Sequence, residues 1–297
     1  MIKKEYHFRD ENLDGLYEKY ASIKRSTCIV CNEDNFELWA KTGPYEAYKC
    51  SKCKLIFMNP QLNDEGLNEY YTNYIGKRRL GNNKKMEQRA EQYLLDARLI
   101  KIFLTEGTIL DVGCNGGFFL DALGENYKRF GTELDSEAVA YAKQNFPRYG
   151  SNIFNGSLKS VKFSKNKFDL VTMRGVIEHV SNPEEIICEI SRILKKNGFL
   201  YFCATPNGES FSANLYRENW NLFHPVQHIW HFSPGNLSTI CNKYGLQLIW
   251  EEFPYLGTPY ENVENDISEI SKYLVNQNDS ISPPFFENMM SLVFQKS

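Results

Sequence analysis

Two C-x-x-C pairs constrain the fold of this chain more than any other feature. The first pair is Cys28 and Cys31, the second is Cys50 and Cys53, and eighteen residues separate the pairs. Two residues between cysteines allow a tight turn to direct both sulfurs at one ion, and two such turns complete a tetrahedron. The spacing predicts a zinc site with four thiolate ligands, rather than a redox centre or four unrelated thiols. Since a closed site has no open coordination position, we expect this zinc to be structural.

The segment between the two pairs predicts a β-hairpin. Residues 36–41 and 45–49 alternate large and polar side chains on either side of Gly43 and Pro44, which is typical of hairpin strands and their turn. Together with the cysteines, this pattern predicts a zinc ribbon at residues 26–60. A module of this size cannot build a core of its own, so metal binding on the order of 10 kcal/mol has to supply its folding free energy.

The composition is that of an ordinary globular protein and excludes several classes. Of the 297 residues, 42% are hydrophobic and 24% are charged, which argues against a disordered chain. The 34 basic and 37 acidic residues give a net charge of −3, so bulk charge does not favour a nucleic-acid partner. No apolar run approaches the roughly 20 residues that span a bilayer, and the charged start lacks the apolar segment of a secretory signal. We therefore expect a cytoplasmic chain with reduced thiols and no membrane span.

Strand and helix patterns alternate from residue 107 onward. Strands are expected at 108–112, 128–132, 151–154, 168–173, 199–204, 247–253 and 289–294. Helices are expected at 84–104, 118–125, 136–146 and 183–194. Alternation of this kind predicts an α/β fold with a Rossmann-like, doubly wound parallel sheet. The expected parts of the chain are an extension at 1–25, the ribbon at 26–60, a linker or lid at 61–84, and an α/β domain at 85–297 with an insertion at about 206–246.

A glycine-bearing turn connects the first strand of this domain to the next helix. Its layout is Asp111-x-Gly113-x-Asn115-x-Gly117, which differs from G-x-G-x-x-G and lacks the Lys-Ser/Thr of a phosphate-binding P-loop. Glycines allow the backbone to approach a ligand closely, and asparagine tolerates positive φ better than most residues. The turn therefore predicts a ligand site, although a turn of this kind is a weak signal by itself.

An acidic residue ends the second strand, twenty-two residues after Asp111. Glu133 at that position can accept hydrogen bonds from both hydroxyls of a ribose. The two strand ends together predict a nucleoside-containing ligand at the carboxyl edge of a parallel sheet. Asp135 is expected to cap the following helix instead of contacting the ligand.

Three motifs in order resemble the class I S-adenosylmethionine-dependent methyltransferases. They read LDVGCNGGFFL, GTELDSEAVAYAKQNF and FDLVTMRGVIEHVSNPEEIICEISRILKKNGFLYFCATPN. With the ribbon and the segment CKLIFMNPQ in front, the layout resembles methyltransferases of bacterial sugar and surface-polysaccharide pathways. The resemblance implies about seven strands with the last one antiparallel, S-adenosylmethionine as the cofactor, and a small sugar-like acceptor, free or nucleotide-activated.

The resemblance also implies which residues bind the cofactor. The implied set is Asp111, Gly113, Asn115, Gly117, Glu133, Leu134, Ser157 and Arg174. Asp111 and Gly113 would face the methionine part, and Leu134 would pack on the adenine. Asn115 stands where the family usually has glycine, and Ser157 stands where an aspartate commonly meets the adenine amino group.

Candidate catalytic bases are few because the chain has five histidines. His228 is the first choice, because it lies in a Pro-x-x-His-x-x-x-Phe-Ser pattern that the resembled family shows in this insertion. His231 and His179 follow as alternatives. His224, His228 and His231 could instead bind a divalent metal, although no neighbouring carboxylate in the sequence supports this.

Further groups could shape the acceptor site. The aromatic candidates for a lid or sugar platform are Tyr70, Tyr71, Tyr74, Trp220 and Trp230. The basic candidates for holding the diphosphate of a nucleotide-sugar are Lys77, Arg78, Arg79, Lys84, Lys85 and Arg89. Cys188, Cys203 and Cys241 are expected in the core, and Cys114 lies in the cofactor turn.

Three other functions stay open at this point. A zinc ribbon ahead of this fold also occurs in RNA methyltransferases, which would show tight, salt-dependent RNA binding. A non-catalytic interaction protein would be consistent with the departures at Asn115 and Ser157. A dinucleotide oxidoreductase is disfavoured by the missing G-x-G-x-x-G. The atom that is methylated and the oligomeric state are left open.

Overall fold

The α/β part of the chain is built on one seven-stranded sheet. The computed structural model describes residues 11–70, 83–276 and 280–297. In sheet order the strands are β12 (Leu246–Glu252), β13 (Met289–Lys296), β10 (Leu194–Pro206), β9 (Phe168–Arg174), β6 (Gly107–Val112), β7 (Tyr127–Glu133) and β8 (Ile153–Asn155). β13 is antiparallel to both of its neighbours, and the other adjacent pairs are parallel. The predicted Rossmann-like α/β fold with an antiparallel last strand is confirmed.

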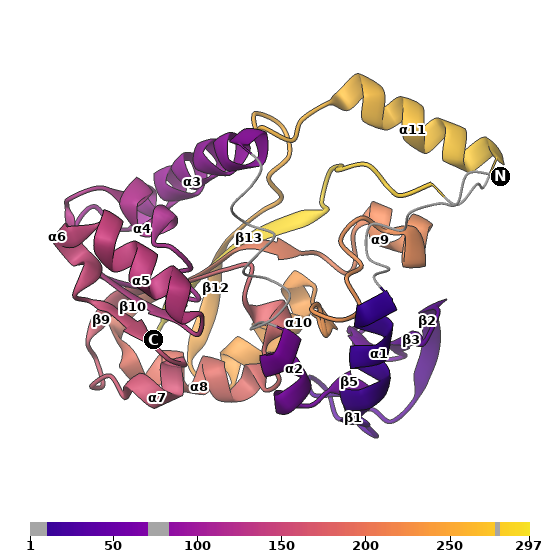
Figure 1. The fold of residues 1–297 in the computed structure, drawn as a ribbon, viewed down its shortest axis with the longest axis horizontal. Coiled ribbons are helices and arrows are strands. Elements are labelled where there is room, and N and C mark those ends of the chain that lie inside the picture. Colours follow the sequence, from indigo (N-terminus) through magenta and orange to yellow (C-terminus); the bar gives the residue numbers. More distant parts are fainter. Residues whose placement is uncertain (1–10, 71–82, 277–279) are drawn as a thin grey trace.

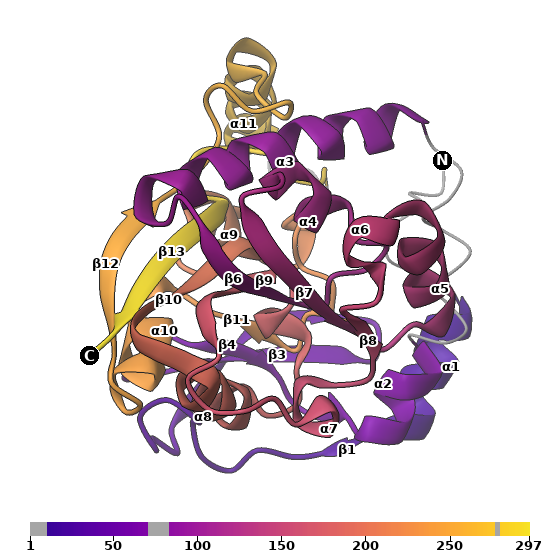
Figure 2. The same ribbon diagram turned by 90° about the vertical axis from the view of Figure 1, so that its left-hand side faces the viewer.

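Helices cover both faces of this sheet (Figure 2). One layer consists of α3 (Asn83–Phe103), α4 (Phe118–Leu123), α5 (Ser136–Asn145) and α6 (Pro147–Gly150). The other contains α7 (Leu158–Val161), α8 (Pro183–Ile193) and α10 (Pro234–Asn242). Successive residues of β6 face opposite layers, because Ile109 packs in the α3–α6 core and Leu110 in the core with α8 and α10. Among the helices of the described residues, none has the length and apolarity needed to cross a membrane.

The cysteine segment forms a second, four-stranded antiparallel sheet. β2 (Phe36–Thr42) and β3 (Tyr45–Cys50) make the predicted hairpin, and Gly43 adopts φ 56° in its turn. β4 (Ile56–Met58) pairs with β3, and the outer strand is β11 (Trp230–His231). Since β11 comes from the insertion that follows β10, the ribbon sheet is completed by the α/β part of the chain.

A separate apolar core joins the N-terminal elements to the ribbon, and Figure 1 shows these elements beside the ribbon strands. These elements are α1 (Glu11–Tyr20), β1 (Ala21–Ile23), β5 (Gln61–Leu62) and α2 (Asp64–Tyr70), with β1 paired to β5. The core also includes residues of α9 (Phe211–Tyr216), the η3 turn (Arg217–Asn219) region and α11 (Val263–Asn276). The ribbon hairpin contributes Trp39 and Tyr45 to this core, while its third strand contributes Phe57 to the core of the large sheet.

Some minor expectations change. Trp220 and Trp230 are 0% and 1% exposed in these cores, so they cannot form a platform for an acceptor. Cys188 is exposed instead of buried, while Cys203 and Cys241 are buried as expected. Of the remaining lid candidates, Tyr70 is 7% exposed in the N-terminal core. Tyr71 and Tyr74, and the basic residues at 77–79, lie outside the described residues, as do the side chains of residues 84 and 85.

Candidate functional site

The two cysteine pairs form two turns of the same construction. The backbone N–H of Asn32 donates to Cys28 O at 2.9 Å, and the N–H of Lys54 donates to Cys50 O at 3.1 Å. The residue after each pair has a positive φ, 58° at Asn32 and 62° at Lys54. Each turn thereby directs two sulfurs to the same side.

The four sulfurs fit one zinc ion. Sγ of Cys28 lies 3.4 Å from Sγ of Cys53, and Sγ of Cys31 lies 3.6 Å from Sγ of Cys50. All four lie within 4.8 Å of one another. A tetrahedral zinc about 2.3 Å from each sulfur requires sulfurs about 3.8 Å apart. The donor set and the spacing thus match a closed structural site.

A cavity of about 1050 Å³ lies at the carboxyl edge of the parallel strands. Of the expected cofactor residues, the cavity is lined by Asp111, Gly113, Asn115 and Arg174. Of the expected bases, it is lined by His179 and His228. The structure thus brings members of both sets to one cavity. The other predicted site residues are not among its lining: Gly117, Glu133, Leu134, Ser157 and His231.

The glycine-bearing turn adopts backbone conformations that its residues suit. Gly113 has φ 72°, and a Cβ there would lie 2.7 Å from the Val176 side chain. Asn115 has φ 49°, and its Oδ1 accepts from the N–H of Gly116 at 2.6 Å. Asparagine therefore serves in a left-handed position where the resembled family usually has glycine.

Glu133 ties the turn to the end of the second strand. Its Oε2 accepts from the N–H of Asn115 at 2.8 Å, and its Oε1 accepts from the N–H groups of Leu134 and Asp135 at 2.8 and 3.0 Å. Leu134 is 64% exposed and leaves an apolar surface beside this carboxylate. Asp135 caps α5 as predicted, accepting from the N–H groups of Glu137 and Ala138.

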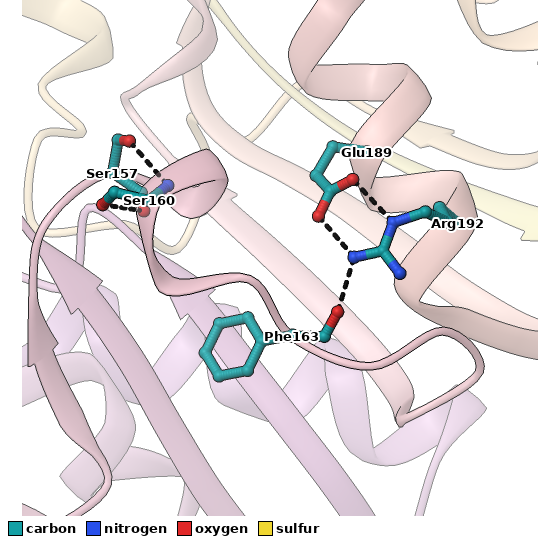
Figure 3. A network of polar contacts seen from close by, with 5 residues as sticks. All are labelled: Ser157, Ser160, Phe163, Glu189 and Arg192. Atoms are coloured by element: carbon teal, nitrogen blue, oxygen red, sulfur yellow. Dashed lines mark hydrogen bonds and ion pairs between the residues drawn. The ribbon is translucent and has the colours of Figure 1, made fainter.

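The hydroxyl of Ser157 caps a short helix. Its Oγ accepts from the N–H of Ser160 at 3.2 Å, and the Ser160 hydroxyl donates to Ser157 O at 2.9 Å (Figure 3). In the same view, Arg192 of α8 pairs with Glu189 and donates to Phe163 O, which holds the segment after α7 against α8. The Ser157 hydroxyl keeps its own proton as a donor.

Asp111 is a buried carboxyl beside the turn. It is 2% exposed, and the Thr172 hydroxyl donates to its Oδ1 at 2.7 Å. Burial raises the pKa of Asp111 to about 7, against the opposing influence of the Thr172 hydrogen bond and of Arg174. A cationic ligand in the cavity would favour the ionised carboxylate.

Arg174 is held by two residues of α3. Its Nε lies 2.8 Å from Oδ2 of Asp96, and its guanidinium lies over the Tyr93 ring at 4.5 Å. Gln92 donates to the other oxygen of Asp96 at 2.9 Å. Gln92, Tyr93 and Asp96 all line the cavity, and none of them was assigned to the site from the sequence. Polar side chains four residues apart on an otherwise apolar helix face were the signal that could have indicated them.

The rings of His179 and His228 lie side by side at the cavity. Their centroids are 4.8 Å apart. Nδ1 of His228 lies 2.8 Å from Leu222 O, and Nδ1 of His179 lies 2.8 Å from Gln227 O. Because a carbonyl can only accept, Nδ1 is the protonated nitrogen in each neutral ring, and Nε2 of His228 carries a lone pair. Burial holds the pKa of His228 well below its usual range, so its ring is neutral near pH 7.

Glu178 adds a carboxyl to this pair, and we call Glu178, His179 and His228 the histidine cluster. Glu178 is 2% exposed, and within the described residues its Oε2 has no hydrogen-bond partner. The three side chains place potential ligand atoms within 4.8 Å of one another. A divalent metal bound by the histidine cluster would therefore have a carboxylate ligand. The alternative site of His224, His228 and His231 offered none. His231 lies apart, among the rings of Trp220 and Phe223, at 5.4 and 5.6 Å.

We expect a Glu178→Gln variant to change how stability depends on pH. Burial raises the pKa of Glu178 to about 8, so between about pH 4.5 and 8 the folded state binds more protons than the unfolded state and loses stability as the pH rises. The variant should be more stable than the parent by about 1–3 kcal/mol at pH 8.5, with the difference shrinking toward pH 4.5. Urea unfolding across this pH range measures the difference in stability between the variant and the parent. A difference that does not change with pH would contradict a buried, neutral Glu178 carboxyl.

The part of the cavity beyond the histidine cluster combines amides with aromatic rings. Asn288 donates to Oδ1 of Asn221 at 3.0 Å, and both line the cavity. Tyr255, Tyr260 and Phe285 line it as well. Side-chain amides and ring faces together suit a polar molecule that also presents C–H surfaces.

Comparison with known proteins gives a family match and related folds. Residues 83–251 match the family model described as a methyltransferase domain. A ubiquinone biosynthesis O-methyltransferase of Nitrosococcus oceani is 27% identical over 47% of this chain and 63% of its own length. The same-named protein of Glaesserella parasuis is 31% identical over 31% of this chain and 43% of its own length. The chain thus matches less than two thirds of the length of these relatives.

Two solved structures show the same fold at low sequence identity. A methyltransferase of Thermotoga maritima, titled a possible histamine N-methyltransferase, superposes with a TM-score of 0.52 at 20% identity over 78% of this chain and 99% of its own. A putative methyltransferase of Haloferax volcanii, solved with the Trm112 activator, superposes with a TM-score of 0.56 at 16% identity, over 79% of this chain and 99% of its own. Both confirm the architecture of the large sheet and its helices.

Proposed function

Because the chain belongs to this family of methyltransferase domains, we propose that it is an S-adenosylmethionine-dependent methyltransferase acting on a small sugar-like acceptor. One observation carries the proposal: a single cavity is lined by the glycine-bearing turn on one side and by the histidine cluster on the other. A cofactor in the turn and an acceptor at the histidines would then meet in one cavity. This is the arrangement that in-line group transfer needs.

The cofactor half of the cavity is assigned to the turn and the strand ends. The backbone of Gly113 and Asn115, continuing to Gly117, approaches the cofactor, and Asp111 faces its cationic part. Glu133 holds the ribose through the lone pair that its backbone partners leave on Oε2. Arg174, which lines the cavity, is assigned to the carboxylate of the methionine part, and Leu134 and Ser157, which lie outside the lining, are assigned to the adenine.

The cofactor supplies an activated methyl group, and the chain has to orient the acceptor, exclude water and take up a proton. The acceptor hydroxyl donates its proton to Nε2 of His228. The cofactor, when bound, would supply the methyl group to the acceptor oxygen, and its sulfur would keep the electron pair of the carbon–sulfur bond. The buried Glu178 carboxylate, once ionised, stabilises the imidazolium.

A sugar-like acceptor is supported by the chemistry of the second half of the cavity. Asn221 and Asn288 can hydrogen-bond hydroxyl groups, and Tyr255, Tyr260 and Phe285 offer ring faces to the C–H side of a sugar ring. Arg89, which is exposed at the cavity, could pair with the phosphate of a nucleotide-activated sugar. The resemblance of the zinc-ribbon layout to sugar methyltransferases points to surface-polysaccharide synthesis as the pathway.

A phenolic acceptor is the second candidate, and the names of the relatives favour it. Both candidates predict the same proton transfer to His228, so they differ only in the molecule that occupies the amide and aromatic half of the cavity.

An acceptor panel tests the proposal. The purified chain is titrated with S-adenosylmethionine by calorimetry and then incubated with sugars, nucleotide-sugars and catechols, while S-adenosylhomocysteine is measured. We expect cofactor binding and product formation with the sugar class. Turnover of catechols alone would replace the sugar assignment by the phenolic one. No binding of S-adenosylmethionine at millimolar concentration would overturn the assignment as a methyltransferase. Salt-dependent RNA binding would support an RNA methyltransferase instead.

Replacing Glu133 with alanine should chiefly weaken cofactor binding. The change removes the ribose contact and also the acceptor of three backbone N–H groups that shape the turn. The loss of charged hydrogen bonds of this kind corresponds to a roughly 10–100-fold higher Kd for S-adenosylmethionine. Calorimetry measures it, with Glu137→Ala on the exposed side of α5 as the control. Equal affinities of the two variants would remove Glu133 from the cofactor site.

A further inference from the structure

The ribbon sheet is bonded to the segment that carries His228. In the antiparallel pairing of β4 with β11, Phe57 lies opposite Trp230 and Ile56 lies opposite His231. One residue beyond this pair, the N–H of Met58 donates to Ile229 O at 3.1 Å. His228 directly precedes Ile229, so the ribbon strand fixes the backbone next to the proposed base.

The same short segment also fixes the other half of the histidine cluster. The N–H of Ile229 donates to Glu178 O at 3.0 Å, and the indole N–H of Trp230 donates to Val180 O at 2.8 Å. The backbone of Ile229 therefore lies between the ribbon and Glu178. Its carbonyl accepts from Met58, and its N–H donates to Glu178 O. The position of His228 relative to Glu178 and His179 therefore depends on the hydrogen bonds that Ile229 and Trp230 make.

A second connection starts at the zinc turn itself. The side chain of Asn236 is buried, and its Nδ2 donates to the backbone oxygen of Cys53 at 2.8 Å. Its Oδ1 accepts from the N–H of Ser233 at 3.1 Å and completes the cap of α10. One asparagine thus connects a zinc-ligating residue to the end of the histidine segment.

The cofactor turn is anchored elsewhere. The N–H groups of Gly113 and Cys114 donate to Thr132 O at 2.8 and 3.0 Å, and that of Asn115 donates to Glu133. These anchors belong to β7, on the far side of β6 from β9 and β10.

From this difference in anchoring, we propose that the zinc ribbon is a positioning element for the histidine cluster: the four cysteines set the geometry of the acceptor site, whereas the cofactor turn is held by its hydrogen bonds to β7. The inference rests on the proposed role of His228 in methyl transfer. It assigns a catalytic consequence to a metal site that takes no part in the chemistry.

The Asn236→Asp variant tests the connection without removing a cysteine. Aspartate keeps the oxygen that caps α10 and replaces the donor to Cys53 O by a second acceptor. We expect amide hydrogen exchange at Met58 and Ile229 to accelerate by about tenfold, and exchange at Gly113 and Cys114 to stay unchanged. Turnover should fall by about tenfold through kcat, with the Kd for S-adenosylmethionine within about twofold of the parent.

Asn182→Asp is the matched control, because Asn182 also caps a helix and lies outside the ribbon. It should change neither the exchange rates nor kcat. Removing zinc from the full chain with a chelator gives a second measurement, in which Met58 and Ile229 should again lose protection before the cofactor turn does. Uniform loss of protection in both regions, or unchanged exchange at Ile229, would overturn the positioning role. Hydrogen exchange is measured without an acceptor substrate, so it tests the positioning role even if no acceptor in the panel is methylated.

Discussion

Replacing His228 with alanine is expected to lower kcat by roughly 10²-fold or more, while the affinity for S-adenosylmethionine stays unchanged. The residue lies at the cavity with its Nδ1 bonded to Leu222 O, and this contact directs the lone pair of Nε2 away from the backbone. Without that lone pair, an acceptor hydroxyl at this position loses the group proposed to take up its proton. The effect should therefore appear in kcat and not in cofactor binding.

A matched substitution separates the loss of the catalytic base from a loss of stability. His228→Asn retains a donor for Leu222 O but has no group at the Nε2 position, so it should be as inactive as the alanine variant and closer to the parent in stability. Calorimetry and steady-state kinetics on the three proteins make the comparison. Unaltered turnover would move the role of base to His179, which also lines the cavity. If activity is lost with a chelator and restored by a divalent ion while the ribbon keeps its zinc, His228 would instead be a metal ligand with Glu178 and His179.

The sequence predicted those parts of the molecule that depend on local spacing. Alternating apolar runs gave the strands of the large sheet to within a few residues, and the two C-x-x-C pairs gave a sulfur arrangement that fits zinc. Asp135 was identified as a helix cap because capping is decided within three residues. Asn115 was accepted at a left-handed position because asparagine tolerates positive φ better than most residues, and in the structure its Oδ1 accepts from the N–H of Gly116.

Contacts between distant segments could not be predicted in this way. β11 has two residues, which is too short for a periodic pattern, and it joins the ribbon across more than 170 positions. Glu178 was passed over as part of the cluster because its neighbour His228 comes from another loop. Trp220 and Trp230 were considered for the acceptor platform because aromatic residues look alike in sequence whether they line a pocket or fill a core.

Replacing Cys50 with serine is expected to have the largest effect on stability. Cys50 is fully buried, its N–H donates to Leu55 O, and its carbonyl accepts from Lys54 in the second zinc turn. A serine cannot replace a thiolate ligand, so the variant should lose its zinc. Metal binding contributes on the order of 10 kcal/mol to modules of this kind, which is comparable with the 5–15 kcal/mol total stability of a typical domain.

The loss should extend beyond the ribbon, because Leu55 before β4 and Phe57 within it pack in the core of the large sheet. We expect the zinc content to fall from about one to about zero per chain, and Tm to fall by more than about 10 °C. Elemental analysis and thermal scans measure both, with Cys188→Ser as the control because that cysteine is exposed on α8. The control should keep its zinc and its Tm. A Cys50→Ser protein with stoichiometric zinc and an unchanged Tm would show that the four cysteines do not form one metal site.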